Sequence, residues 1–583
     1  MSNQDTGIGI GIRPASVTAY RLSFNGCINQ FVLSMDFALT GRSMIPHSAW
    51  FEFVLFKLDT PASAVPVAST RGGIFRSALD KYSRKIFGVH YTERVPSTQG
   101  TWMPFNATEK VEGWKDFGFA FYTGADPLPG NAKNNVKSFL SVGETFVQVD
   151  VEANTSEDLL AGLRKCRTSE CGMASSSHIV GFDDNMVYYD AKADDSEDPD
   201  EKKDLKTVPL NINPRTSAGG DKIRQVRALY DSALAVANAT VDGIFVGGVD
   251  EYSTVLDYHQ SMFKHLGVTP LYDSNFNPCT LSYSWTLDFL KELARKLRTE
   301  HDADAMIMGS SVYTQFPHAS KYVDVAGLET DWAPKGAYTP IDHETLLHYR
   351  ANAYHKPYLL LQSTNFSAWT REMTENYMQT SLLYGFWPGF AYSEEDNTTY
   401  FADEGIYGRD RDLFAKYIPA IETVAGQRWE PVTCASVATT DGSLGYVERW
   451  GGSTKFPMYL TVRVESQDPP KNESLEVTVD LGCLSVESWS KDEVNVTEIV
   501  QNDGLAADPS GDSDKMTFTF TFETGKTYLF MIEGNITIQH DDDEFIYDEY
   551  GNEEFEGASA ALLVSRAAVF ALAALAYLAA LLA

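Results

Sequence analysis

The chain is short of basic residues. Its 583 residues include 47 lysines and arginines against 80 aspartates and glutamates, a formal net charge of −33 at pH 7. Because nucleic acids are bound largely through lysine and arginine contacts to phosphate, we expect no nucleic acid or other polyanion as a partner. The balance is compatible with a neutral or cationic substrate, and a solubilising acidic surface explains it without any specific partner.

The chain also lacks the motifs of several large functional classes. It has no Gly-x-x-x-x-Gly-Lys-Ser/Thr phosphate loop, no His-Glu-x-x-His pair and no Gly-x-Ser-x-Gly elbow. Its six cysteines show no repeated Cys-x-x-Cys spacing, so we expect no structural zinc, no other metal and no cofactor. Cys434 could pair with Cys483, and Cys166 with Cys171, but the sequence leaves the pairing open.

No signal peptide is visible over Met1 to Thr18, since no basic region there precedes an apolar core and a cleavage site. Asn-x-Ser/Thr sequons nevertheless predict passage through a glycosylating secretory pathway. The two observations agree if the natural chain begins upstream of Met1. The sequons begin at Asn106, Asn154, Asn238, Asn365, Asn397, Asn472, Asn495 and Asn535.

The carboxyl-terminal segment, 557–583, has the layout of a GPI-attachment signal. Three small residues, Gly557 to Ser559, precede a short segment and an uninterrupted apolar run from Ala567 to the end. Gly557 and Ser559 are the candidate attachment sites. A membrane-spanning tail anchor is the alternative, although the run is short and no Lys or Arg follows it. We expect a cell-surface or extracellular protein attached to a membrane by this tail, with the acidic residues 541–556 as a solvated stalk.

In the middle of the chain, strand and helix signals alternate, which is typical of βα units around a parallel sheet. We therefore predict an α/β fold with a (β/α)8 barrel over residues 71–426. The eight expected strands lie at 100–105, 117–122, 145–151, 241–246, 305–308, 322–328, 358–361 and 385–391. The expected helices lie at 74–87, 156–165, 221–238, 285–298, 345–355 and 371–383.

Both flanks alternate between apolar and polar residues with a period of two. Residues 1–70 read as a partial N-terminal β-sandwich, with the strongest strands at 31–37 and 50–56. Residues 427–540 predict an antiparallel β-sandwich with one solvated face. Its expected strands lie at 447–450, 458–464, 475–481 and 516–522.

Acidic and aromatic residues follow several predicted barrel strands, at the rim where active sites of such barrels form. Glu329 and Asp331 end the strand at 322–328, and Glu329 is the first choice for a catalytic carboxylate. Hydrolysis of a glycosidic bond usually needs two carboxyl groups facing each other. Asp250 and Glu251 follow Gly247 and Gly248 after another strand, and either is a candidate partner or merely a solvated loop residue.

Other residues expected at the rim are weaker candidates. Glu152, Glu394 and Glu395 follow further predicted strands and could contribute a carboxylate. The indoles of Trp102, Trp332 and Trp387 could stack on a sugar ring, although core packing is the commoner role for a tryptophan.

Several segments resemble glycoside hydrolases of the α-galactosidase-like barrel superfamily, over residues 45–440. They include Gly327-Leu-Glu-Thr-Asp-Trp, His348-Tyr-Arg-Ala-Asn-Ala-Tyr-His-Lys-Pro-Tyr-Leu-Leu-Leu, Leu383-Tyr-Gly-Phe-Trp-Pro-Gly and Arg409-Asp-Arg. The resemblance implies a barrel with one acid after the fourth strand and another after the sixth. Glu329 matches the second position. At the first, where the pattern implies an Asp, this chain has Gly247.

These observations predict a glycoside hydrolase that cleaves O-glycosidic bonds of an oligo- or polysaccharide with a carboxylate pair at the barrel rim. The alternative is a catalytically inactive barrel that binds carbohydrate at the cell surface or has a structural role. Gly247 favours the alternative, whereas Glu329 is compatible with both.

Overall fold

The structure is a computed structural model that divides the chain into the units Met1–Asp543 and Glu544–Ala583. The described residues are 6–12, 20–28, 30–35, 37, 53–59, 70–87, 91, 99–104, 108–144, 147–152, 205–236, 239–250, 255–258, 263, 270–273, 276–314, 317–390, 400–439, 443–452, 456–466, 471–501 and 504–538. Several predictions lie outside them: Glu251, Glu394, Glu395, Asn106, Asn154, Asn238, Asn397, the 166–171 cysteine pair, the helix at 156–165, the stalk, and the tail with Gly557 and Ser559. Among the described residues, no helix has the length and hydrophobicity needed to cross a bilayer.

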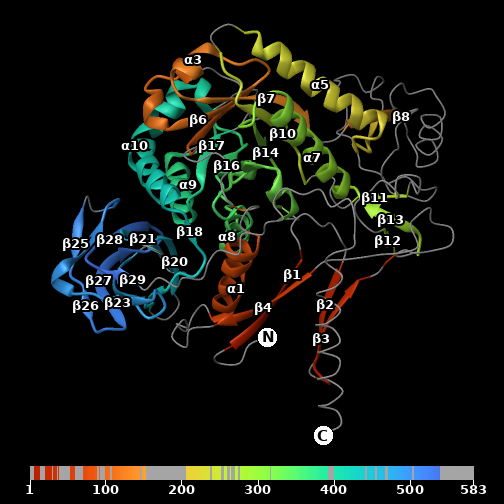
Figure 1. Cartoon of the computed structure of the whole chain (residues 1–583). Coiled ribbons are helices and arrows are strands. Elements are labelled where there is room, and N and C mark those ends of the chain that lie inside the picture. Colours follow the sequence, from red (N-terminus) through yellow and green to blue (C-terminus); the bar gives the residue numbers. More distant parts are fainter. Residues whose placement is uncertain are drawn as a thin grey trace, which may run out of the picture. The chain divides into compact units, whose positions relative to one another are not determined.

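Eight parallel strands close into a barrel, in which each strand pairs with its neighbour in the chain and the last pairs with the first (Figure 1). This confirms the predicted (β/α)8 barrel. The strands are β5 (Thr101–Pro104), β6 (Phe119–Gly124), β7 (Lys137–Glu144), β10 (Gly243–Gly247), β14 (Met306–Gly309), β15 (Val325–Thr330), β16 (Tyr358–Gln362) and β17 (Trp387–Phe390).

One predicted barrel strand was wrong. The strand expected at 145–151 is β8 (Val147–Glu152), which pairs antiparallel with β9 (Leu205–Leu210) in a separate two-stranded sheet. The third barrel strand is instead β7, which pairs with β6 and β10. Its sequence mixes Lys, Ser, Gly and Glu with apolar residues, so it lacks the apolar run that marks a buried parallel strand.

Helices alternate with the barrel strands, and their ends follow local capping signals. In α9, Thr370 caps the first turn by accepting a hydrogen bond from the Met373 backbone N–H, and Gly385 ends the helix with φ 59°. Asp342 caps α8 in the same way through Thr345. The helices are α3 (Pro129–Lys133), α5 (Ser217–Leu234), α7 (Tyr283–Glu300), α8 (His343–Ala353), α9 (Arg371–Tyr384) and α10 (Glu404–Gln427). Single turns are η2 (Thr108–Lys110), η3 (Trp114–Phe117), η5 (Pro317–Lys321), η6 (Pro334–Gly336) and η7 (Tyr400–Ala402).

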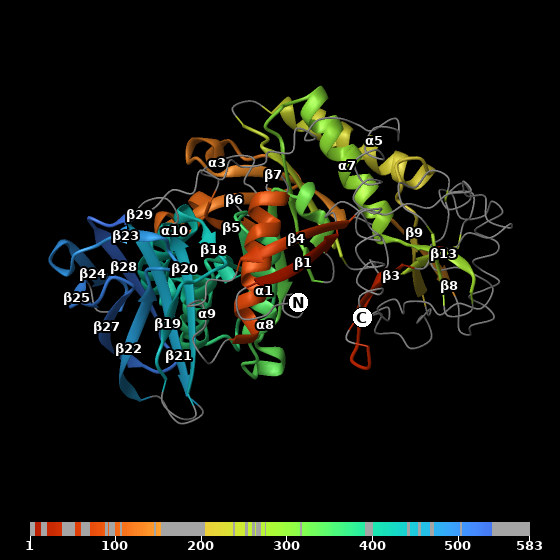
Figure 2. The ribbon, with the colours of Figure 1, turned by 60° about the horizontal axis from the view of Figure 1, so that its bottom comes forward.

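The C-terminal region is an antiparallel β-sandwich, as predicted; its strands are drawn in blue in Figure 2. The disulfide Cys434–Cys483 links the segment before its first long strand to a turn between later strands. One sheet has the order β18 (Trp429–Glu430), β20 (Ser443–Gly451), β21 (Met458–Ser466), β28 (Thr527–Gly534), β24 (Val494–Glu498), β25 (Leu505–Ala507). The other has β19 (Ala435–Val437), β22 (Asn472–Asp480), β27 (Lys515–Glu523), β26 (Ser510–Gly511); β23 (Val486–Ser488), β29 (Thr537–Ile538) and the turn η8 (Lys491–Glu493) complete the region.

Before the barrel, the described N-terminal strands form two antiparallel pairs. β1 (Thr6–Ile12) pairs with β4 (Phe53–Asp59), and β2 (Tyr20–Asn25) pairs with β3 (Gln30–Met35). They are followed by α1 (Thr70–Asp80) and the π-helical turn η1 (Lys81–Ile86); α1 lies beside β4 in Figure 2. A small sheet of β11 (Leu256–Asp257), β13 (Pro278–Leu281) and β12 (Leu271–Tyr272) is inserted between β10 and α7.

The interior of the barrel is filled by side chains. The rings of Trp102 on β5 and Phe245 on β10 approach to 5.5 Å between centroids, although their strands are not neighbours. Both rings therefore lie inside the barrel. Since side chains alternate along a strand and register partners face the same side, this contact fixes which residues of the other strands point inward.

Candidate active site at the barrel mouth

Glu329 points into the mouth of the barrel. Trp102 is in register with Gly389, Gly389 with Leu361, and Leu361 with Glu329, so all four share the inward face. Glu329 is the second-last residue of β15, at the carboxyl end of the strand, and it is exposed. The sequence placed this carboxylate after the sixth strand, and β15 is the sixth strand of the barrel in chain order.

The equivalent position on the fourth strand has no side chain. Phe245 points inward, so Gly247, two residues further along β10, also faces the mouth. Asp250 follows but is only 1% exposed. Its Oδ2 accepts a hydrogen bond from Thr314 Oγ1 at 3.2 Å, and its backbone N–H donates to the Ser311 carbonyl. Asp250 is thus held against the segment that follows β14.

The surroundings of Asp250 are tyrosine-rich. Burial, and after it the Asp250 carboxylate, raises the pKa of Tyr283 well above its usual value. The pKa of Tyr313 is raised by burial, by Tyr91 and by Asp250. The Asp250 carboxylate, buried beside these tyrosines, differs in its surroundings from the exposed carboxylate of Glu329.

Two further residues that were predicted to lie at the rim, Glu152 and Trp387, lie elsewhere. Glu152 is the last residue of β8, outside the barrel, because the third barrel strand is β7. Trp387 is the first residue of β17, at the amino end opposite the rim, where its Nε1 donates to Gln99 Oε1 at 2.6 Å.

The three candidate tryptophans are core residues. Trp102 and Trp387 are each 1% exposed and Trp332 is fully buried. Trp332 packs edge-on against Tyr377 of α9, and Trp102 Nε1 donates to Thr123 Oγ1. With their faces covered by protein, they offer no stacking surface for a sugar.

The turn after Glu329 is held by hydrogen bonds. Asp331 is exposed, and its Oδ1 accepts from the Ala333 backbone N–H at 2.8 Å. Gln362, at the end of β16, accepts from the Trp332 backbone N–H at 3.1 Å. These contacts fix the chain direction directly beyond the candidate carboxylate.

Sequence reasoning missed Glu144. It is the last residue of β7 and the register partner of Gly247, so a second carboxylate-bearing residue ends a strand beside β10. Glu144 would have been found if the third barrel strand had been predicted at Lys137–Glu144, but the sequence prediction put that strand at 145–151.

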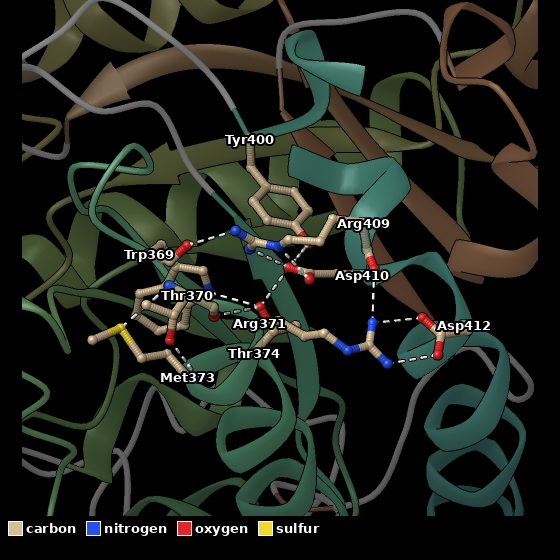
Figure 3. A network of polar contacts seen from close by, with 9 residues as sticks. All are labelled: Trp369, Thr370, Arg371, Met373, Thr374, Tyr400, Arg409, Asp410 and Asp412. Atoms are coloured by element: carbon tan, nitrogen blue, oxygen red, sulfur yellow. Dashed lines mark hydrogen bonds and ion pairs between the residues drawn. The ribbon is translucent and has the colours of Figure 1, made fainter. Parts of the chain in front are cut away.

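A polar network between the first turns of α9 and α10 was also missed (Figure 3). The buried carboxylate of Asp410 accepts two hydrogen bonds from Arg409, at 2.7 Å each, one from Thr374 Oγ1 at 2.6 Å and one from Tyr400 OH at 2.9 Å. Arg409 also donates to the Trp369 carbonyl. The network ties α9, α10 and the loop after β16 together. Among the residues that the structure describes, no three His, Cys, Asp or Glu side chains gather in a metal-ligand group.

No protein-family model matches the chain, and no curated protein matches it. Solved structures do. An α-amylase from Geobacillus thermoleovorans is 11% identical with a TM-score of 0.39, covering 76% of this chain and 100% of the amylase. A family 27 β-L-arabinopyranosidase from Geobacillus stearothermophilus is 9% identical with a TM-score of 0.36, covering 69% and 75%. A family 30 xylanase from Clostridium acetobutylicum is 10% identical with a TM-score of 0.28, covering 76% and 98%. Values at this level assign no family.

Proposed function

We propose that the chain is a glycoside hydrolase whose barrel mouth binds an oligo- or polysaccharide and whose Glu329 is an essential carboxylate. The observation that carries the proposal is the placement of Glu329: inward-facing, exposed and at the carboxyl end of the sixth strand. A carboxyl group there can protonate a leaving glycosidic oxygen or activate the attacking group. Membership of the α-galactosidase-like superfamily belongs to this proposal.

The second carboxylate is proposed to come from the neighbourhood of β10. Glu144 is in register with Gly247, and Glu251 of the predicted pair lies outside the described residues. Asp250 is the weaker candidate because it is buried against Thr314.

The competing function is an inactive barrel that binds carbohydrate. The inward-facing Gly247, at the position where a carboxylate was expected, favours it. The three candidate tryptophans are buried, so they cannot stack on a bound sugar, and this weighs against a binding function that depends on stacking.

The test is hydrolysis of a panel of aryl glycosides and of algal and microbial polysaccharides by the full chain, beside Glu329→Gln and the matched control Asp331→Asn. Turnover that is lost in Glu329→Gln and kept in Asp331→Asn supports the glycosidase. If neither the parent chain nor the variants hydrolyse any substrate, but polysaccharide gels retain the parent chain, the carbohydrate-binding function replaces the glycosidase proposal.

We also propose that the protein is glycosylated and held at the cell surface by its carboxyl-terminal tail. Asn472, Asn495 and Asn535 are exposed on the sandwich, which suits oligosaccharide attachment. Expression in a eukaryotic secretory host, followed by enzymatic removal of N-glycans and, separately, by phospholipase cleavage, tests both parts. An unchanged mass contradicts glycosylation. Membrane-bound protein that phospholipase does not release contradicts a GPI anchor and favours the tail anchor, and protein found free of membranes contradicts attachment by the tail.

A further inference from the structure

The connection between β10 and α7 carries the small sheet of β11, β13 and β12 (Figure 1). This connection leaves β10 at its carboxyl end and enters α7 at its first residue, so both of its ends lie at the rim of the barrel. Within it, β12 and β13 pair antiparallel as a hairpin. The insertion is therefore attached to the barrel at the same end as the mouth that contains Glu329.

The turn of this hairpin presents an aromatic ring to solvent. Phe276 is 79% exposed. The ring of Tyr272, the last residue of β12, is half-buried and lies edge-on to it at 6.3 Å between centroids. The next residue, Asn277, is exposed and polar. An apolar patch of this size is far smaller than a protein interface, which buries about 800 Å² on each partner, but it matches one face of a sugar ring.

The Asp273 side chain holds the turn in place. Its Oδ1 accepts a hydrogen bond from the Asn277 backbone N–H at 2.7 Å, and its Oδ2 accepts from Asn277 Nδ2 at 3.0 Å and from Tyr258 OH at 3.2 Å. The Asp273 carbonyl also accepts from the Phe276 backbone N–H at 3.1 Å. Since the backbone that carries the ring is already ordered, a ligand that stacks on it costs little further conformational entropy.

The backbone at Phe276 is strained, with φ 62°. Hairpin turns with three residues between the strand ends usually place glycine at such a position, because a Cβ is crowded when φ is positive. A bulky residue there is rare, and strained residues gather at sites that hold a ligand. Glycine would suit the turn better than phenylalanine does, so the ring has a role beyond the stability of the turn.

We propose that Phe276 is a stacking platform for one sugar of a polysaccharide, with Tyr272 and Asn277 at its border. The platform supplies the stacking surface that the buried tryptophans at the strand ends do not. This inference rests on the carbohydrate function proposed for the barrel mouth. It narrows the substrate to a polymer that contacts the mouth and the insertion at once.

The experiment measures dissociation constants of the full chain for each polysaccharide of the panel by electrophoresis through gels that contain it. For the polysaccharide bound most tightly by the parent chain, Phe276→Ala should raise the dissociation constant at least about tenfold, because it removes the stacking ring. Phe276→Trp keeps an aromatic face and should retain binding. The control is Phe75→Ala, which removes an aromatic ring that is 58% exposed on α1 and should leave binding unchanged.

Phe276→Gly separates the role of the ring from the stability of the turn. Glycine adopts positive φ without strain, and the exposed ring contributes little burial. The melting temperature of this variant should therefore equal or exceed that of the parent chain, while its dissociation constant rises as in Phe276→Ala. A loss of binding in a chain that folds this well belongs to the ring.

The platform and the barrel mouth can fail separately. Binding by Phe276→Ala that equals that of the parent chain, or a parent chain that binds no polysaccharide of the panel, would overturn the platform. Hydrolysis of aryl glycosides by the parent chain tests the barrel mouth alone. If that hydrolysis is absent but polysaccharide binding depends on Phe276, the platform stands and the glycosidase proposal fails.

Discussion

At the scale of single residues, the carboxylates near the barrel mouth differ in their surroundings. Glu329 is exposed on the inward face of β15, whereas Asp250 is buried and bonded to Thr314. The exposed Glu329 carboxylate can exchange protons with a bound ligand, whereas the Asp250 carboxylate accepts a hydrogen bond from Thr314. The two residues should therefore respond differently to substitution.

Asp250→Ala should lower the free energy of unfolding by about 1–3 kcal/mol, because it removes a buried carboxylate and leaves the half-buried Thr314 hydroxyl without its acceptor. Urea denaturation measures the change. Unchanged stability together with lost turnover would instead return Asp250 to the list of catalytic acids.

Glu144→Gln should reduce turnover by about 100-fold or more if this residue supplies the second carboxylate beside Gly247. The control variant is Glu422→Gln. Glu422 is an exposed residue of helix α10, which follows the last barrel strand. Parent-like rates in Glu144→Gln would leave Glu251 and the weaker candidate Asp250.

At the scale of elements, one buried carboxylate connects several of them. Asp410 on α10 accepts hydrogen bonds from Thr374 on α9 and from Tyr400 in η7. We expect Asp410→Asn to cost about 2 kcal/mol of unfolding free energy, because the buried carboxylate loses its charge-assisted hydrogen bonds from Arg409, whose own side chain is 34% exposed.

The control comes from the same network. Asp412 pairs with Arg371 through two hydrogen bonds, but its side chain is 69% exposed. Asp412→Asn should cost less than about 1 kcal/mol, as exposed pairs do. Equal losses in the two variants, measured by denaturant unfolding, would show that Asp410 does not link the elements as described.

Several barrel strands were predicted because each contains a continuous apolar run. Strands β10, β14, β15 and β16 are buried along nearly their whole length and read as apolar segments. β7 was displaced because its sequence is mixed. Helix α10 was not predicted; it contains Pro419 and three glycines, which weaken a helical pattern that packing sustains.

At the scale of the molecule, polar contacts join barrel helices to the sandwich. Thr461 Oγ1 on β21 donates to the Leu383 carbonyl at 2.8 Å, and the Thr527 backbone N–H donates to Gln379 Oε1 at 2.7 Å. His343, at the start of α8, lies 3.2 Å from Glu465 Oε1 and stacks on Tyr446. The interface therefore includes an ionisable pair.

Stability at this interface should depend on pH. The His343 hydrogen bond first, and then the Arg463 charge, lower the pKa of Glu465 from 4.5 to about 2. Since the folded-state pKa lies below the unfolded value, the stabilisation is present above about pH 4.5 and is lost as the pH falls towards 2. Glu465→Gln should lower the melting temperature at pH 7, and the difference should shrink on acidification. A difference independent of pH would contradict this assignment.

The site was less predictable than the fold. Glu329 was found because a carboxylate ending an apolar strand is conspicuous. The burial of Trp102, Trp332 and Asp250 was not predicted from the sequence. It depends on contacts with Phe245, with α9 and with the segment after β14, respectively, which are distant in sequence. Which side of the sheet a residue faces required the register of the closed barrel.

The most direct test of the central claim is hydrolysis of the best substrate from the panel by Glu329→Ala, with and without sodium azide. We predict a rate at least about 100-fold below that of the parent chain, with recovery in azide, because the small anion can occupy the space of a missing catalytic carboxylate. Parent-like hydrolysis by Glu329→Ala would contradict the assignment of the barrel mouth as the active site.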